Sequence, residues 1–307
     1  MTGNAPAGAD AVAPSPAVGR ARPRPGEVIR PRPTAWQRFL QHRTAVAGAA
    51  TIAVLALAAV VAPWIIARSP IAVDLLAPFH PPGPGHPFGT DDLGRDVFSR
   101  IVHGGRYALG LSLLSASLAA AVGVTVGVAT GYSGGWIDGV VMRVVDVLLA
   151  FPAFLLGLAL MAAVGPSLAN IVAVLAFTRM PRFARLLRGA TLGLKTAEYI
   201  SAARAAGSTG GRIIFKHILP NCLGPAMVFI SLDLGAIVTS LAGLSFLGVG
   251  LQPPTPDWGI MLTDGRKFLQ TAPWVALFPG AAITLTVMAF NFIGDGVRDA
   301  LDPRSIR

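Results

Sequence analysis

The sequence predicts an all-α polytopic membrane protein with six transmembrane helices. Of its 307 residues, 53% are hydrophobic and only 13% are charged, whereas charged residues make up about a quarter of a typical soluble domain. The mean hydropathy is +0.62. Several uncharged runs reach the length of about 20 residues that a helix needs to cross a bilayer. These observations exclude an ordinary water-soluble globule and make the lipid bilayer the expected environment.

The charge balance and the cysteine count bear on nucleic-acid binding, disulfide bonds and metal clusters. The formal net charge of +10 would suggest a nucleic-acid partner in a soluble protein. Here the basic residues lie between the apolar runs, so we expect no nucleic acid to bind. The single cysteine, Cys222, excludes an internal disulfide and any metal cluster held by several cysteines.

The N-terminal part divides into a tail and a first span. Residues 1–43 are rich in Ala, Pro and Arg and lack apolar periodicity, which predicts a disordered cytoplasmic tail. Residues 44–67 are uncharged and would form a helix about 36 Å long, longer than a hydrocarbon core of about 30 Å. We interpret them as the first transmembrane helix, because a cleaved signal peptide fits poorly with so long a preceding segment.

Residues 68–106 are predicted to form an external loop with a short amphipathic helix. Within this loop Leu93, Val97 and Ile101 lie four residues apart, as on one face of a helix. Two opposite charges, Asp91 and Arg95, share this spacing. Such a helix either packs between the spans or forms a gate or docking surface at the membrane interface, and the sequence leaves both readings open.

Residues 107–293 are predicted to form a five-helix core, followed by a cytoplasmic C-terminus at 294–307. The run from 147 to 178 contains Gly165-Pro166-Ser167, a turn signal that divides it into two spans. The uncharged or nearly uncharged runs of the core are 107–137, 147–178, 222–247 and 273–293.

Three glycines recur every four residues in the first core helix, at Gly123, Gly127 and Gly131. This spacing lets another helix approach closely. We favour packing within one subunit over a dimerisation surface.

The distribution of basic residues predicts the topology. With six spans, 19 of the 25 Lys and Arg residues lie on one side of the membrane. Because basic loops stay on the cytoplasmic side, both termini are expected in the cytoplasm. Residues 190–221, with their dense basic charge, are expected there too.

No catalytic residues and no metal site are predicted in this chain. None of its five histidines forms an H-E-x-x-H pair. His80 and His86 flank a Pro- and Gly-rich stretch, which we interpret as a rigid external loop rather than a metal site. The stretch 193–196 lacks the spacing of a phosphate-binding loop, so we expect the chain itself to bind no cofactor and to hydrolyse no ATP.

The cytoplasmic loop 190–221 contains the most informative pattern. Thr196 is a candidate N-cap, Glu198 carries a negative charge in the first turn, and Gly207 suits a left-handed C′ position. These signals predict a helix over Ala197–Ala206 with a slim, alanine-rich surface. A helix of about 15 Å is marginal alone in water, so we expect it to need a partner's surface.

The string EYISAARAAGSTGGRIIFKHILPN at 198–221 resembles the EAA loop of ABC importer permeases. Its details resemble the second permease subunit of the dipeptide, oligopeptide and nickel branch. Three further segments agree with that branch: FGTDDLGRDVFSR at 88–100, LSFLGVGLQPPTPDWG at 244–259 and GDGVRDALDPR at 294–304. The resemblance covers about residues 36–304.

The resemblance implies a type I ABC importer permease fold in the plasma membrane of a prokaryote. It also implies a second homologous permease, two cytoplasmic ATP-binding subunits that hold ATP and Mg, and an external substrate-binding protein. The helix in the EAA-type loop would then be a coupling helix seated in a cleft of an ATPase. The ATPase-coupling residues implied by position are Glu198, Tyr199, Ala202, Ala203, Arg204, Ala206 and Gly207.

Asp233 is the one charge predicted deep within a span, which makes it a candidate translocation-path residue. It either meets a cationic group of the cargo or forms a hydrogen-bonded structural contact, since lipid exposure would cost about 2.5 kcal/mol or more. The sequence departs from the family pattern at Leu241, where family members often have Glu.

The implied function is import of di- or oligopeptides, driven by a separate ATPase. Nickel or glutathione as cargo remains open, because the matching motifs concern coupling and fold. An ATP-independent secondary transporter is less favoured, since neither internal repeats nor intramembrane charges other than Asp233 are evident. A membrane enzyme would need convergent acids, histidines or a nucleophile.

Overall fold

The computed structural model describes residues 34–66 and 68–301. Within these ranges the chain is helical and has no strands, only two isolated β-bridges, which confirms the all-α prediction. Helices α8 and α9 are joined through a π-helical turn, Ile214–Ile218, and a 3₁₀ turn, Arg266–Phe268, follows α10. The helices are α1 (Ala35–Gln41), α2 (Arg43–Ile65), α3 (Val97–Ser133), α4 (Gly135–Ala150), α5 (Ala153–Val164), α6 (Leu168–Lys195), α7 (Glu198–Ala205), α8 (Gly210–Ile213), α9 (Leu219–Phe246), α10 (Trp258–Gly265) and α11 (Trp274–Leu301).

Four helices are long and apolar enough to cross a membrane, and a bent pair, α4 with α5, adds a fifth candidate span. The four are α2, α3, the continuous stretch Gly210–Phe246 that ends in α9, and α11. Helix α6 has 28 residues, but it carries four arginines between Arg179 and Arg188. The polytopic membrane architecture is thus confirmed, and the count of six stays a prediction.

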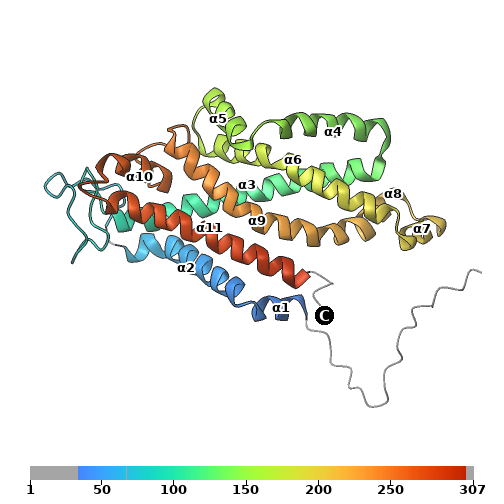
Figure 1. Ribbon diagram of the computed structural model, residues 1–307, viewed down its shortest axis with the longest axis horizontal. Helices are drawn as coiled ribbons and strands as arrows, with labels where there is room; N and C mark the ends of the chain where they lie inside the picture. Colours follow the sequence, from blue (N-terminus) through green and yellow to red (C-terminus); the bar gives the residue numbers. More distant parts are fainter. Residues whose placement is uncertain (1–33, 67, 302–307) are drawn as a thin grey trace, which may run out of the picture. The chain divides into compact units, whose positions relative to one another are not determined.

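The long helices lie roughly along a common axis, and the bundle has two distinct ends (Figure 1). Helix α7, the start of α2 and the last turn of α11 lie toward one end, and the segment 68–96 and α10 lie toward the other. We call these the α7 end and the α10 end. Helices α3 and α6 both run toward the α7 end, so α4 and α5 together bring the chain back between them.

The closest helix packing joins α3 to α6. A Cβ atom at Gly131 would lie 2.9 Å from the Cβ of Thr191, and Cβ atoms at Gly123 and Gly127 would overlap Phe183 and the backbone of Ala184. The glycine spacing therefore serves packing within the subunit, as the sequence predicted. Alongside this contact, the ring of Phe183 meets that of Phe229 on α9 edge-on at 4.7 Å.

The predicted disordered tail at 1–43 needs a correction. Residues 1–33 lie outside the described residues, but the last part of the tail is ordered. Thr34 and Gln37 form a reciprocal capping box that starts α1, and α1 packs against α11. The first long helix then follows almost directly as α2, close to its predicted position at 44–67.

The predicted amphipathic helix near residues 88–106 was wrong in its first half. Residues 68–96 are irregular, and α3 begins at Val97 with the Asp96 carboxylate accepting a hydrogen bond from Ser99 N at 2.7 Å. Gly94 has φ +71°, a left-handed conformation that breaks a helix. Asp91 and Arg95 do pair, at 2.7 Å, but across a turn in which Asp91 Oδ1 also accepts from Arg95 N.

The predicted third span, which began at residue 147, was also wrong as a straight helix. The chain bends by 90° between α4 and α5, and α5 has only 12 residues, or about 18 Å against the roughly 30 Å of a hydrocarbon core. Pro152 explains the break: proline donates no backbone hydrogen bond and pushes the preceding residue, Phe151, out of the helical region.

The α3 and α6 contact predicts a position-specific effect of bulk. We expect Gly127→Leu to destabilise the folded chain by about 1–3 kcal/mol, the range typical of overpacking. The measurement is the thermal unfolding midpoint of the purified protein in detergent. Gly110→Leu is the matched control, because a Cβ at Gly110 meets nothing within 4 Å. Equal midpoints for the two variants would contradict the packing argument.

Candidate functional site

Helix α7 forms at the predicted place with a different first cap. It spans Glu198–Ala205, and its N-cap is Ala197, which makes no side-chain capping bond. The Thr196 hydroxyl instead donates to the carbonyl of Gly193 at 3.0 Å. The prediction of Thr196 as the cap was therefore wrong, because its side chain bonds back to the end of α6.

The C-terminal end of α7 confirms the prediction for Gly207. This residue has φ +81°, the left-handed conformation expected of a C′ glycine. The Ser208 N–H bonds to the Ala203 carbonyl and the Gly207 N–H to the Arg204 carbonyl, both at 3.0 Å. These two bonds form a Schellman motif, which ends the helix sharply after two turns.

One side chain attaches α7 to the rest of the molecule. Ile200 is fully buried and belongs to an apolar cluster with Leu187, Ile213 and Ile218. Ala203 is half-buried. Every other residue of the helix is exposed, so α7 presents nearly its whole circumference outward at the α7 end (Figure 1).

The exposed surface of α7 combines two charges, one aromatic ring and small side chains. Tyr199 is 45% exposed, and its ring centroid lies 6.3 Å from that of His217. Of the implied coupling residues, the structure leaves these exposed: Glu198, Tyr199, Ala202, Arg204, Ala206 and Gly207. A narrow helix with one buried side chain leaves most of its surface free for a partner protein to contact from several sides.

Short connections tie α7 to three long helices. Lys195, at the end of α6, donates its Nζ hydrogen to the carbonyl of Tyr132 at the end of α3. Ile213 and Ile218, which surround Ile200, lie on the helical stretch that continues into α9. A displacement of α7 would therefore act on α3, α6 and α9 together.

Asp233 lies in the middle of α9 and forms an ion pair with Arg179 of α6. The Arg179 Nη1 atom is 3.2 Å from Asp233 Oδ1, and the two side chains are 7% and 6% exposed. Arg179 Nη2 also donates to the Ala236 carbonyl at 3.0 Å and to Ser240 Oγ at 2.6 Å. This geometry favours the structural reading of Asp233, because its charge is balanced within the subunit.

Arg179 is the partner of Asp233 that the sequence analysis did not predict. It directly follows the uncharged run that ends at Thr178, so its position at the edge of a span was visible. Its partner, Asp233, lies 54 residues away along the chain. The spacing of residues within one helix does not indicate which residue of another helix it will contact. The expectation of a single deep charge is therefore replaced by an ion pair.

At the α10 end, two segments that carry the family motifs meet. The indole N–H of Trp258 donates to the Ile101 carbonyl at 2.9 Å, so α10 is tied to the start of α3. Arg95 contacts both Asp91, at 2.7 Å, and Asp264 of α10, at 4.0 Å. Burial is the main cause that raises the pKa of the Asp264 carboxyl.

His80 and His86 lie next to each other in the 68–96 segment, and other side chains contact both ring nitrogens of His86. The His86 Nδ1 atom lies 2.8 Å from Asp96 Oδ2, and its Nε2 lies 2.7 Å from an Arg68 nitrogen. The rings of His80 and His86 are 5.7 Å apart. Within the described ranges, no three metal-ligating side chains come together.

Two family models match the sequence. One is described as a binding-protein-dependent transport system inner membrane component and matches residues 123–307. The other is described as the N-terminal TM domain of oligopeptide transport permease C and matches residues 32–82. The first match includes α7 and the helices from α4 to α11, and the second includes α1 and α2.

Curated relatives are similar over nearly the whole chain. The dipeptide transport system permease protein DppC of Alkalihalophilus pseudofirmus is 43% identical over 276 residues, 90% of this chain and 91% of that protein. A putative peptide transport system permease protein of Brucella abortus is 42% identical over 268 residues, 87% and 90% of the two chains. The glutathione transport system permease protein GsiD of Salmonella typhimurium is 44% identical over 284 residues, 92% and 93%.

The ion pair between α6 and α9 predicts a coupled pair of mutations. We expect Asp233→Leu alone to destabilise the protein by about 3–5 kcal/mol, because it leaves the Arg179 charge buried without a partner. The double variant Asp233→Leu with Arg179→Met should regain most of that loss. Thermal unfolding midpoints of the wild type, both single variants and the double variant measure the coupling. Additive effects would show that the two side chains do not interact.

Proposed function

The chain belongs to the family of binding-protein-dependent transport system inner membrane components, as an ABC importer permease of the peptide and nickel branch, and on that premise we propose that it forms half of a translocation pathway for short peptides. A permease of this kind works in a complex with other subunits. The partners that we propose are a second homologous permease, two cytoplasmic ATP-binding subunits and an external substrate-binding protein.

The observation that carries this proposal is the form of α7. It is an exposed, alanine-rich helix with one buried anchor, Ile200, and a sharp end at Gly207. Such a helix is marginal alone in water, so its surface suits contact with a partner. We assign that partner as one of the ATP-binding subunits, which places the α7 end in the cytoplasm.

Each end of α7 offers a different contact to that subunit. Glu198 lies in the first turn and Arg204 in the last turn, so opposite charges mark the two ends of the helix. Between them Ala202 and Ala206 present only methyl groups, which permit close approach. Glu198 would meet basic or polar groups of the ATPase, and Gly207 would allow the chain to turn away from the cleft.

Transport then follows from movement of α7 as a rigid lever. When the two ATPases close and reopen during their nucleotide cycle, the gripped α7 is displaced with them. Its links to α3, α6 and α9, through Lys195 and the cluster around Ile200, carry this displacement into the spans. Alternation between inward-facing and outward-facing arrangements exposes a solute to each side in turn. ATP and Mg supply the energy on the partner subunits, and this chain contributes no catalytic group.

Short peptides are the cargo that the relatives favour. Relatives named as dipeptide, peptide and glutathione permeases match 87–92% of this chain, and glutathione is itself a small peptide. Nickel remains the alternative within the same transporter class. An ATP-independent secondary transporter would take up solute without any ATPase subunit, and uptake that requires the ATPase separates the two classes.

Substitutions in α7 are expected to abolish uptake without preventing membrane insertion. Glu198→Arg reverses the charge at the proposed contact, and Gly207→Val places a β-branched side chain at φ +81°, which only glycine and asparagine adopt readily. Peptide uptake and copurification of the ATPase subunits are the measurements, normalised to the amount of permease in the membrane. Gly207→Asn is the matched control and should retain uptake. Normal uptake by both Glu198→Arg and Gly207→Val would remove the coupling assignment.

The orientation of the α7 end is testable by labelling. We expect Ser208→Cys, in a Cys222→Ala background, to react with a membrane-impermeant maleimide only from the cytoplasmic side. Leu76→Cys is the matched control, because Leu76 is 97% exposed in the segment at the α10 end and should react only from outside. Labelling of Ser208→Cys from the exterior would contradict both the topology and the coupling role.

A further inference from the structure

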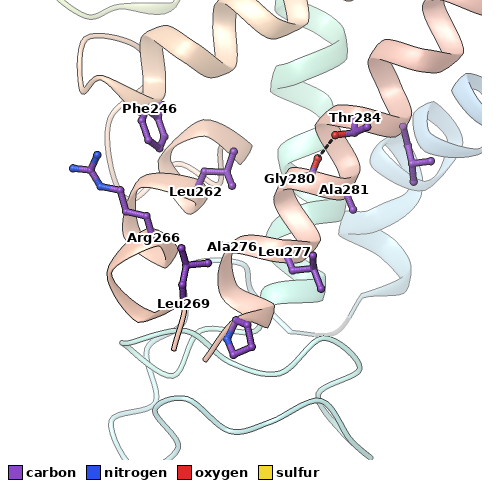
Figure 2. A pocket seen from close by; sticks show the side chains of 11 residues that line it. Phe246, Leu262, Arg266, Leu269, Ala276, Leu277, Gly280, Ala281 and Thr284 are labelled. Atoms are coloured by element: carbon purple, nitrogen blue, oxygen red, sulfur yellow. Dashed lines mark hydrogen bonds between the residues drawn. The ribbon is translucent and has the colours of Figure 1, made fainter. Parts of the chain in front are cut away.

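An apolar cavity that is open on one side lies at the α10 end, between the end of α9, helix α10, the turn that follows it and the first half of α11. Its volume is about 740 Å³, within the range of about 300–1,000 Å³ typical of sites for small ligands. Figure 2 shows its lining side chains, among them Phe246, Leu262, Leu269, Leu277 and Ala281.

Arg266 is the only charged side chain in the lining. Its guanidinium carbon lies 5.2 Å from the centroid of the Phe246 ring, so an aromatic face supports the charge. None of the ion pairs formed among residues 34–66 and 68–301 includes Arg266. The cavity therefore joins apolar walls to one cation that pairs with no carboxylate of the described residues.

The cavity continues into an exposed face along α11. Leu277, Ala281 and Thr284 line the cavity, and Met288 and Asn291 follow on the same side of the helix, at spacings of three and four residues. All five are exposed. The Thr284 hydroxyl bonds to the Gly280 carbonyl within the helix at 2.9 Å (Figure 2).

This face suits a water-filled path better than lipid. The neutral but polar amide of Asn291 is exposed within a helical run that has no charged residue, and polar groups within a span usually face a cavity or another protein segment. A lipid tail along this face would cover that amide without offering it a hydrogen bond. A polar solute that enters at the cavity would meet Thr284 and Asn291 in succession.

We propose that this cavity receives the C-terminal residue of a peptide cargo as it enters the pathway at the α10 end. The apolar side chain would lie between Leu262, Leu277 and Ala281, and the α-carboxylate would pair with Arg266. The planar guanidinium suits this role because it binds carboxylates through two parallel hydrogen bonds. The inference rests on the proposed function and adds a preference for peptides that end in a large apolar residue.

The test is uptake of two dipeptides, Ala-Phe and Ala-Ala, by the complete importer reconstituted in proteoliposomes. Each rate is divided by the wild-type rate for the same peptide, so the selectivity of the external binding protein cancels. Ala281→Trp fills the cavity and should lower uptake of Ala-Phe severalfold while leaving uptake of Ala-Ala near the wild-type rate. Leu57→Trp, on an exposed position of α2, is the matched control and should affect neither peptide.

The role of Arg266 is tested with the same two peptides. Arg266→Gln should lower uptake of Ala-Phe about tenfold, which corresponds to about 1.4 kcal/mol, and Arg266→Lys should restore part of it. Lys267→Gln removes the neighbouring exposed cation, which does not line the cavity, and should leave uptake unchanged.

Three results would overturn the proposal. If Ala281→Trp lowers the uptake of Ala-Phe and Ala-Ala equally, the cavity does not distinguish the C-terminal side chain. If Arg266→Gln and Lys267→Gln take up the peptides at equal rates, Arg266 does not contact the carboxylate. A phospholipid that copurifies with the wild type and is lost in Arg266→Gln, with normal peptide uptake, would make the cavity a lipid site. If the wild-type importer moves neither peptide, the proposed function fails as well, so the two failures are distinguishable.

Discussion

The close contact between α3 and α6 is the constraint on which the rest of the structure depends. At Gly123, Gly127 and Gly131 the two backbones approach so closely that a methyl group would collide with the opposite helix. This contact holds two long parallel helices together, and their ends are joined again where Lys195 meets the Tyr132 carbonyl. Helix α7 begins directly beyond that point. The position of the candidate coupling helix therefore follows from van der Waals packing in the middle of the bundle.

Ion pairs explain how α6 can carry three of its four arginines and still belong to an apolar bundle, and the fourth, Arg182, is exposed. Arg179 pairs with Asp233 of α9, and Arg188 makes two hydrogen bonds of 2.6 Å to Asp138 of α4. Arg185 pairs with Asp146, also on α4. Each pair neutralises charge and connects α6 to a neighbour. The same charges that lower the hydropathy of α6 thus select which helices pack against it, because an unpaired charge would be costly away from water.

The two sites described above lie at opposite ends of shared helices. The continuous stretch from Gly210 to Phe246 starts beside α7 and ends in the lining of the cavity, and α6 is held to it at mid-length by Arg179 and Asp233. Under the proposed function, a rigid displacement at the α7 end would reach the cavity walls through these helices without any change in local secondary structure. This arrangement is what alternating access requires, since one movement must act on both mouths of a path.

Features set by a local pattern of residues were predictable from the amino-acid sequence. Hydropathy predicted the all-α membrane class, and the glycine spacing predicted a close helix contact within the subunit. The EYISAARAAG string with Gly207 predicted a short helix and carried the family resemblance. These succeed because helix period, left-handed glycine and span length are properties of adjacent residues. The predicted helix boundaries were wrong where another local interaction competed with the signal. At Thr196 the hydroxyl bonds back to Gly193, and before Val97 the left-handed Gly94 breaks the helix.

The tertiary structure decided the features that depend on residues far apart in the chain. The pairing of Asp233 with Arg179 and the cavity beside Arg266 appear only when several helices meet. The physical reason is that ion pairs and cavities are set by the packing of side chains from different helices, and the period of one helix does not specify which neighbour its faces will meet.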